Sequence, residues 1–567
     1  MSWIESLYRT YELNYGNELG ELKLNPVFHI QQNAHICVAV DIDGNFRSAR
    51  VITDKNEIKK IIPVTRKSGT RAGSGLVPHA LFDKLMYVAG DFSGERCGFK
   101  EYMEQLNDWC ESEYFHPKVC AVRTYLEKKR LIRDLVEHKI LPVDENGELL
   151  IKKPPNLEQN EVPAIFGVVP SDPTTALVVF ECHKFDDPEV KLWEDKSVQE
   201  SWTDYCNAQL TKGSDSDALG LCYISGEKTS LCASHPKNIR YGGDRAKLIS
   251  SNDTTNFTFR GKFEEASQAC GVGTEVTQKA HNALSWLFEI QGWHDDSQYV
   301  VAWAIAKDVS APSPVCDTGE FTFGNIEPEN GSGMPGTAEE SAKALGMKID
   351  GYRSKLNATD MAVLMVESAT DGNMAIKYYR ELPGSEFLDH LEHWHTNCAW
   401  MQFFGKDKQF YGAASPREIT KVVYGSRCDA KLVKSTVARL LPCIMDGKPL
   451  PRDIVIGAVR SASNPNALNS GQKWEFSRNL GVACSLYKYS KLEEKYSMAL
   501  EEDRKTRGYL YGRLLAVADY LESSALQLTD EKRDTNAMRL MQRFSDRPYS
   551  TWRNLALKLE HYKSRLR

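Results

Sequence analysis

The strongest constraint on the fold of this chain is a change of pattern near residue 400. Beyond about residue 385 almost no strand pattern occurs, and stretches with the apolar spacing of helices follow one another to the end. These stretches are 385–400, 415–424, 429–441, 451–461, 473–490, 494–526, 533–546 and 549–565. We therefore expect an α+β fold, in which a mixed N-terminal region with antiparallel hairpins and helices is followed by an all-α C-terminal helical bundle.

The length of the chain predicts more than one core. Single hydrophobic cores stop growing beyond about 250–300 residues, and this chain has 567. We expect one α+β region at residues 1–400 and the helical bundle at residues 401–567. A stretch rich in Pro, Gly, Ser and Asp at 308–337 is a long loop that can separate two subdomains of the first region.

Turn sequences predict two hairpins in the first region. One runs through 35–40, turns at Asp43-Gly44-Asn45 and returns through Val51 and Ile52. The other joins 361–366 to 374–379 through a turn that contains Asp371-Gly372. Other predicted helices are 1–13, 99–113, 117–137, 193–209, 274–290 and 338–350, and other predicted strands are 58–64, 221–233 (as a hairpin), 246–249 and 299–306.

Composition indicates an ordinary globular protein of the cytoplasm. The net charge is -6, so a uniformly basic coat for nucleic acid is excluded but a local basic face is not. The N-terminus does not resemble a signal peptide, and no apolar run approaches the length of a membrane span. The 14 cysteines are scattered without any Cys-x-x-Cys pair. We therefore expect no zinc ribbon, no metal and no cofactor, and thiols that stay reduced.

Two polar segments are candidates for contact with nucleic acid. Residues 235–263 combine cations, short polar side chains and the aromatic rings of Tyr241, Phe257 and Phe259, which suits phosphates, sugar edges and bases. Residues 65–75 hold three glycines and three cations, so the backbone can approach an anionic partner closely. They lack the spacing of a phosphate-binding P-loop, which excludes an NTPase of that kind. Solvated surface loops are the competing interpretation of both segments.

No self-contained active site is visible in the sequence. The single metal-like cluster is His390, His393, His395 and Cys398, which lacks the spacing of known zinc motifs. We expect a helix packed through Phe387, Leu391, Trp394 and Trp400 instead. A metal-dependent nuclease or hydrolase that uses this cluster stays open as an alternative, as does a pure scaffold protein.

The helical end combines an apolar stripe with a basic surface. In the longest predicted helix we expect a bundle-facing stripe of Leu510, Leu514, Val517, Ala518 and Leu521. In the last helices the cations outnumber the carboxylates. Such an excess is usually a solvated face, but it also suits a groove that follows the backbone of a single strand.

Several stretches together resemble one known family. These are residues 74–90, 247–252, 369–379 and 509–519, and finally Thr535-Asn536-Ala537 with Arg547-Pro548 and Trp552. In this order and spacing the chain, from about residue 30 onward, is similar to the large subunit of the type I-C CRISPR surveillance complex (Cascade). It departs from the family at Ser251, where a larger residue is more common, and at Asn373, where Arg is common.

The resemblance implies a non-catalytic subunit. Such a subunit reads the protospacer-adjacent motif on target double-stranded DNA, promotes duplex opening and R-loop formation, stabilises the displaced strand and helps to recruit the helicase–nuclease. Its partners would be the crRNA and the crRNA-capping and backbone subunits. They would also include a small subunit made by internal translation of its own C-terminal region, with Met445 as the plausible start and Met498 disfavoured because it would cut the bundle.

Residues that match these expectations can be named. For contact with the duplex and its motif we expect Lys67, Ser68, Gly69, Thr70, Arg71, Arg240, Lys247, Ser251, Asn252, Thr255 and Asn256. Lys67 and Arg71 are assigned to phosphates, and Asn252 to reading of the motif. For the displaced strand we expect Arg539, Arg543, Arg547 and Arg553.

Overall fold

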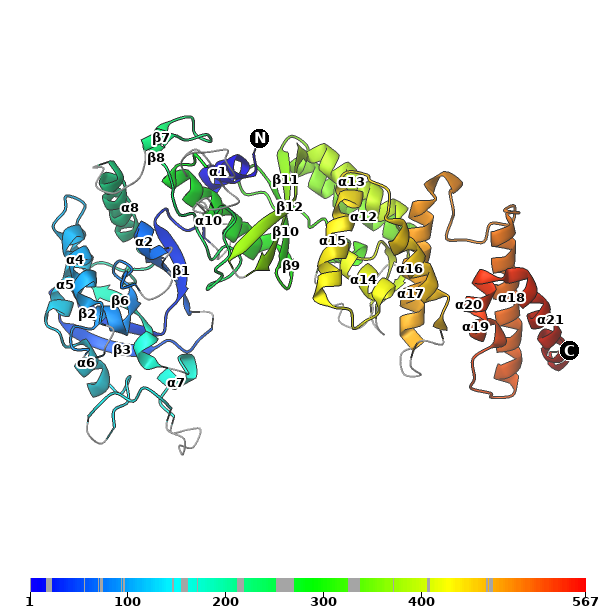
Figure 1. The fold of residues 1–567 in the computed structure, drawn as a ribbon, viewed down its shortest axis with the longest axis horizontal. Coiled ribbons are helices and arrows are strands. Elements are labelled where there is room, and N and C mark those ends of the chain that lie inside the picture. The colour runs from blue at the N-terminus through cyan, green and yellow to red at the C-terminus, as the bar shows by residue number, and fades with distance from the viewer. Residues whose placement is uncertain are drawn as a thin grey trace, which may run out of the picture. The chain divides into compact units, whose positions relative to one another are not determined.

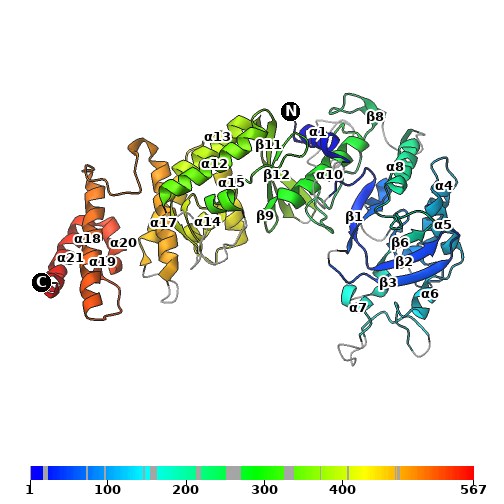
Figure 2. The ribbon, with the colours of Figure 1, turned by 180° about the vertical axis from the view of Figure 1, so that it is seen from behind.

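The computed structural model describes most of the chain as two compact units (Figures 1 and 2). It describes residues 2–566 apart from 17–22, 56, 70, 72–74, 93, 95–96, 145–146, 154–161, 171, 212–218, 251–269, 325–336, 371, 405–407, 466–467 and 469–472. Unit 1 comprises Met1–Ile290 and Ser368–Ala375, and unit 2 comprises Gln291–Glu367 and Ile376–Arg567. The fold is α+β, as predicted. The division into an α+β region at 1–400 and a helical bundle at 401–567 stays a prediction.

Unit 1 contains a mixed four-stranded sheet with the order β3-β2-β6-β5. The strand β2 pairs antiparallel with β3 and parallel with β6, and β5 pairs antiparallel with β6. Two smaller sheets join β1 to β4 and β7 to β8. The strands are β1 (His29–Asn33), β2 (Ile36–Asp41), β3 (Phe46–Val51), β4 (Lys59–Pro63), β5 (Asp83–Lys84), β6 (Leu177–His183), β7 (Leu219–Leu221) and β8 (Lys228–Ser230).

Helices form much of the rest of unit 1. They are α1 (Trp3–Asn14), α2 (Arg66–Gly69), α3 (Leu85–Val88), α4 (Phe99–Cys110), α5 (Pro117–Glu127), α6 (Leu131–Glu137), α7 (Ile165–Val168), α8 (Lys196–Thr211) and α10 (Thr274–Gln291), with a 3₁₀ turn at Pro173–Thr175. Trp109 of α4 and Trp202 of α8 are fully buried, and their ring centroids lie 4.8 Å apart. The first predicted hairpin is confirmed by the antiparallel pairing of β2 with β3. At its turn the Asp41 carboxylate accepts the N–H groups of Asp43 and Asn45 at 3.0 and 2.8 Å.

Unit 2 begins with an antiparallel sheet in the order β12-β11-β10-β9. Every residue of β10 is buried, which confirms the predicted buried strand. The strands of unit 2 are β9 (Trp293–Asp295), β10 (Gln298–Ala304), β11 (Asp360–Thr370), β12 (Asn373–Pro383), β13 (Trp400–Phe403) and β14 (Gln409–Gly412). The hairpin of β13 and β14 lies inside the stretch that was predicted to be almost free of strands. The tip of the β11–β12 hairpin belongs to unit 1.

The helices of unit 2 pack around two separate hydrophobic clusters. They are α11 (Thr318–Phe323), α12 (Ala338–Leu356), α13 (Gly384–Asn397), α14 (Pro416–Tyr424), α15 (Ala430–Met445), α16 (Arg452–Ala462), α17 (Lys473–Ser490), α18 (Arg507–Leu528), α19 (Asn536–Arg539), α20 (Met541–Asp546) and α21 (Pro548–Arg565). The larger cluster joins α12–α17 to β10 and β11. The smaller one, centred on Ala518, Leu526 and Leu555, belongs to α18, α19 and α21.

The predicted bundle-facing stripe of the longest helix is largely wrong. Ala518 is buried and Leu521 is half-buried, but Leu510, Leu514 and Val517 are exposed, Val517 to 62%. The packed face instead includes Ala525 and the fully buried carboxylate of Glu522. A count of apolar spacing misses this face, because one of its central residues is charged.

Two other predictions of secondary structure differ from the fold. The helix expected at 494–526 begins only at Arg507, and residues 495–506 form turns and extended backbone. The strand expected at 246–249 is reduced to one bridge between Lys247 and Asn373. Across the described residues, no helix combines the length and the apolar character needed to cross a bilayer.

Buried histidines predict that the fold loses stability in acid. Burial lowers the pKa of His29 and His281 to about 4 and that of His79 and His235 to about 3. Below the ordinary value of about 6.5 the unfolded chain binds protons that the folded chain does not, so stability falls as the pH falls. We expect His281→Gln to reduce the pH dependence of the free energy of unfolding by about 1.4 kcal/mol per pH unit between pH 6 and 4.5. Urea denaturation followed by tryptophan fluorescence measures this slope, and an unchanged slope would contradict a neutral buried His281.

Candidate nucleic-acid interface

The two polar segments singled out in the sequence lie side by side in unit 1. The Arg66 guanidinium of α2 donates to the backbone carbonyl of Leu231 at 3.3 Å. The Lys237 ammonium donates to the backbone carbonyl of Arg71 at 2.6 Å. The sequence could not establish this proximity, because 166 residues separate Lys237 from Arg71.

A third segment, the tip of the β11–β12 hairpin, joins the same place. The backbone N–H of Lys247 donates to the carbonyl of Gly372 at 3.2 Å, and the N–H of Met374 donates to the carbonyl of Lys247 at 2.9 Å. Asn373 is therefore held beside Lys247, and both Gly372 and Asn373 are exposed. Three segments that are distant in the sequence thus form one surface of unit 1.

Positive charge gathers on this surface at Lys237, Arg245 and Lys247. Burial lowers the pKa of the Lys237 ammonium, and the positive charges of Lys247 and Arg245 lower it further. Burial also lowers the pKa of Lys247, whose ammonium donates to Ser234 Oγ at 2.8 Å. Within the described ranges, no carboxylate lies within 4.0 Å of the charged nitrogens of these three cations. An anion bound here would relieve their mutual repulsion.

Arg71 is used inside the protein. Its guanidinium donates to both carboxylate oxygens of Asp83 at 2.7 and 2.8 Å and to the carbonyl of Val77 at 2.9 Å. Asp83 is fully buried and also accepts the N–H of His79 at 2.6 Å. The positive charge of Arg71 is thus matched by a buried carboxylate, and the residue holds the loop after β4 in place.

Arg240 is likewise paired inside the protein. Its guanidinium donates to both oxygens of the Asp244 carboxylate at 2.8 Å, and the two side chains are only 4% and 2% exposed. In this arrangement the guanidinium holds the turn from Arg240 to Asp244 closed, and it presents no free edge to a phosphate.

The other predicted residues of the first loop have distinct places. Ser68 is buried. Its Oγ accepts the backbone N–H of Thr65 at 2.9 Å, and its own N–H donates to Thr65 Oγ1 at 3.0 Å. Gly69 closes the same turn by donating to the carbonyl of Thr65 at 2.9 Å. Lys67 is exposed. Thr70, Ser251, Asn252, Thr255 and Asn256 lie outside the described residues.

Two cations of the surface were not among the predicted site residues. Lys237 and Arg245 were visible in the sequence as charges of the second segment. Asp244 sits directly before Arg245 and looks like its natural partner. In the fold, however, the Asp244 carboxylate pairs with Arg240, and Arg245 is exposed.

The arginines predicted for the displaced strand lie on the C-terminal helices. Arg539 ends α19, Arg543 lies in α20, Arg547 joins α20 to α21, and Arg553 lies in α21. All four are exposed.

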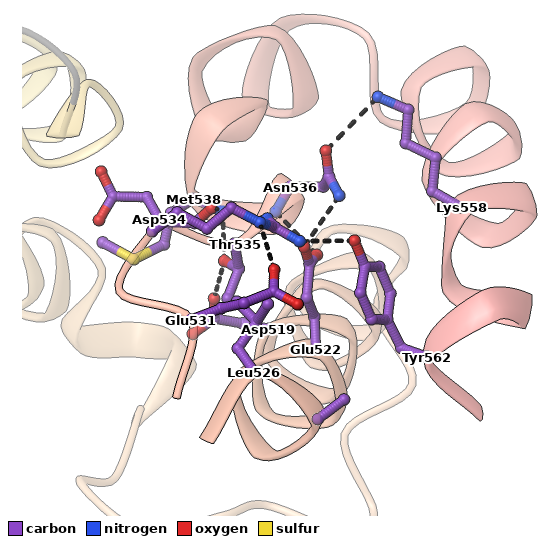
Figure 3. Close-up of polar contacts among 12 residues, drawn as sticks. Asp519, Glu522, Leu526, Glu531, Asp534, Thr535, Asn536, Met538, Lys558 and Tyr562 are labelled. Atoms are coloured by element: carbon purple, nitrogen blue, oxygen red, sulfur yellow. Dashed lines mark hydrogen bonds and ion pairs between the residues drawn. The ribbon is translucent and has the colours of Figure 1, made fainter. Parts of the chain in front are cut away.

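A polar network fixes these helices (Figure 3). The buried Glu522 carboxylate of α18 accepts the Asn536 backbone N–H at 2.7 Å and its Nδ2 at 2.9 Å. Glu522 also accepts Arg533 Nη1 at 3.0 Å, and the Nη2 of Arg533 donates to the Tyr562 hydroxyl at 2.6 Å. Thr535 donates its hydroxyl to Asp519. Residues of α18, α19 and α21 are thereby held together, so the arginine-bearing helices have a defined placement on the bundle.

The histidine–cysteine cluster does not converge. His395 is buried and its Nδ1 meets Thr318 Oγ1 at 2.8 Å, while Cys398 donates to Ser485 Oγ at 3.8 Å. His390 faces Glu386 at 3.5 Å, and His393 accepts Asn397 Nδ2 at 3.0 Å. Burial raises the pKa of Cys398 to about 12, so it is a neutral thiol. In the part of the chain that the structure describes, no group of three or more such side chains could hold a metal ion. The geometry thus offers no support for the metal-dependent alternative.

The chain matches a known protein family. The family model described as CRISPR-associated protein (Cas_Csd1) matches residues 7–567. No curated protein matches the chain.

The different environments of the cations predict different effects of their removal. Arg240→Ala leaves the buried Asp244 carboxylate without its partner, so we expect a loss of roughly 3–5 kcal/mol of stability. Arg245→Ala removes an exposed charge and should change stability by less than about 0.5 kcal/mol. Chemical denaturation of both variants checks this. An Arg240→Ala variant as stable as the parent would show that the ion pair contributes no stability.

Proposed function

Because the chain belongs to the CRISPR-associated protein family Cas_Csd1, we propose that it is the non-catalytic large subunit of a type I-C surveillance complex (Cascade). In this role it recognises the protospacer-adjacent motif on double-stranded DNA and promotes duplex opening and R-loop formation. It also steadies the displaced strand and helps to recruit the helicase–nuclease. The crRNA reads the target by base pairing, while the protein reads the motif and the shape of the duplex.

One observation supports motif recognition by unit 1 above the others. Three segments meet in a surface where Lys237, Arg245 and Lys247 have no carboxylate partner among the described residues, on a chain with a net charge of -6. A local excess of this kind on an acidic protein favours a polyanion at that surface and not over the whole molecule.

The environments of the residues divide their proposed roles. Lys67, Lys237, Arg245 and Lys247 contact phosphates, because they carry charge at or near the surface. Arg71 and Arg240 act as positioning residues, because each guanidinium is held by a buried carboxylate. Asn252 and its neighbours Ser251, Thr255 and Asn256 stay the proposed readers of base edges, since amide and hydroxyl groups suit base acceptors.

The C-terminal bundle is the proposed site for the displaced strand. Its exposed residues Arg539, Arg543, Arg547 and Arg553 can follow phosphates without reading sequence. The helices that carry them are fixed by the buried Glu522, so the charges have a defined spacing.

The proposed partners are the crRNA, its capping and backbone subunits, the helicase–nuclease, and a small subunit made from the C-terminal region. Met445 is the last residue of α15 and is a plausible internal start. Met498 precedes α18 in a segment without helix, so a start there would leave α18–α21 whole. The intact mass of the small subunit in a purified complex distinguishes the two starts.

The role in motif recognition predicts a dependence on this chain. We would assemble the crRNA and partner subunits with and without it, and titrate duplexes with matched or scrambled flanking motifs at fixed salt. Preference for the matched motif should disappear when this chain alone is left out. Unchanged preference would remove the role and favour a pure scaffold.

The phosphate contacts predict a change in salt dependence. Lys247→Ala should weaken binding to all duplexes, whatever their motif, and should lower the slope of log affinity against log salt by about 0.9. Lys100→Ala, at a lysine of α4 whose side chain is 84% exposed, is the matched control and should change neither quantity. A loss for one motif only would assign Lys247 to reading of bases instead.

A further inference from the structure

Hydrogen bonds close the loop from Arg240 to Asp244 on itself. Besides the double hydrogen bond between the two side chains, the N–H of Asp244 donates to the carbonyl of Tyr241 at 3.1 Å. The N–H of Asn238 donates to the carbonyl of Asp244 at 2.8 Å. Gly243 has a φ of +92°, a conformation that favours glycine, so the turn is built into the sequence.

This closed loop presents one aromatic ring to solvent. Tyr241 is 55% exposed, although an aromatic ring gains free energy by burial. The two residues after it are exposed glycines, and a Cβ added to either would meet nothing within 4 Å. The backbone beside the ring is therefore open to a flat partner.

The ion pair of Arg240 and Asp244 is better explained by the loop geometry that it holds than by a gain in stability. Taking a guanidinium and a carboxylate out of water costs several kcal/mol per ion, and such pairs often add little net stability. The pair of Arg240 and Asp244 holds together the two ends of the tight turn that carries Tyr241.

Cations lie on both sides of the loop in the sequence. Lys237 precedes it, and Arg245 and Lys247 follow it. Lys237 lies near enough to the other two for their charges to lower its pKa, so the three belong to one electrostatic cluster. An exposed ring combined with several cations matches a nucleotide, which presents a flat base and an anionic phosphate together.

We propose that Tyr241 is a stacking platform for an unpaired nucleobase whose neighbouring phosphates lie on Lys237, Arg245 and Lys247. The inference rests on the proposed function, because duplex opening supplies the unpaired bases. Bases inside an intact duplex are stacked on each other and leave no free face, so the ligand is a single-stranded stretch of the target. The closed loop makes the platform available without rearrangement.

The test uses the full chain and a single-stranded oligodeoxythymidine in which some bases are replaced by 5-iodouracil. Ultraviolet light joins this base to an aromatic side chain on which it stacks. We expect a crosslink within residues 237–247 that is lost in Tyr241→Ala and kept in Tyr241→Phe. We also expect Tyr241→Ala to weaken binding of the oligonucleotide by about tenfold and Tyr241→Phe by less than twofold. Phe185→Ala, at a ring that is 91% exposed after β6, is the matched control and should bind as the parent does.

The salt dependence separates stacking from charge. Tyr241→Ala should leave the slope of log affinity against log salt unchanged, because the ring carries no charge. Equal affinity and an equal crosslink in Tyr241→Ala would overturn the proposal, and so would a parent chain that neither binds nor crosslinks the strand. A crosslink at Tyr241 in a chain that shows no motif preference on duplexes would support the platform while removing the proposed motif reader.

Discussion

The fully buried carboxylate of Asp83 fixes the loop on which the candidate interface depends. It accepts two hydrogen bonds from the Arg71 guanidinium and one from the backbone of His79. The carbonyl of Arg71, held in place by this pair, accepts the ammonium of Lys237 from the second polar segment. A buried charge must be matched inside the protein, so this one interaction sets the position of both segments.

The carboxylate partners of Arg71 and Arg240 also determine which positive charges stay available to a ligand. Arg71 and Arg240 are each matched to a carboxylate, and their contribution to the surface is largely cancelled. Lys237, Arg245 and Lys247 are left without such partners among the described residues. The result is a local positive surface on an acidic chain. It arises because the carboxylate nearest in sequence, Asp244, is paired with Arg240.

The C-terminal bundle repeats this principle with a different outcome. Glu522 is buried in the face of α18 that packs against its neighbours, and it holds Arg533 and the backbone of Asn536. The network orders the turn before α19 and leaves the arginines of α19–α21 on the outside. In both units a buried carboxylate thus fixes a turn, and exposed cations lie on the elements beside that turn.

The sequence by itself determined the class of the fold and several of its elements. Turn chemistry at Asp43-Gly44-Asn45, the continuous apolar run of β10 and the helical spacing beyond residue 400 are local properties, and local patterns are read reliably from sequence. The order of the resembling stretches also agrees with the family match over residues 7–567. Only the tertiary structure decided which side of α18 is buried, that Arg245 and not Arg240 is exposed, and that segments 166 residues apart are adjacent. These outcomes depend on competition between partners for buried carboxylates, and neither spacing nor composition specifies which partner wins.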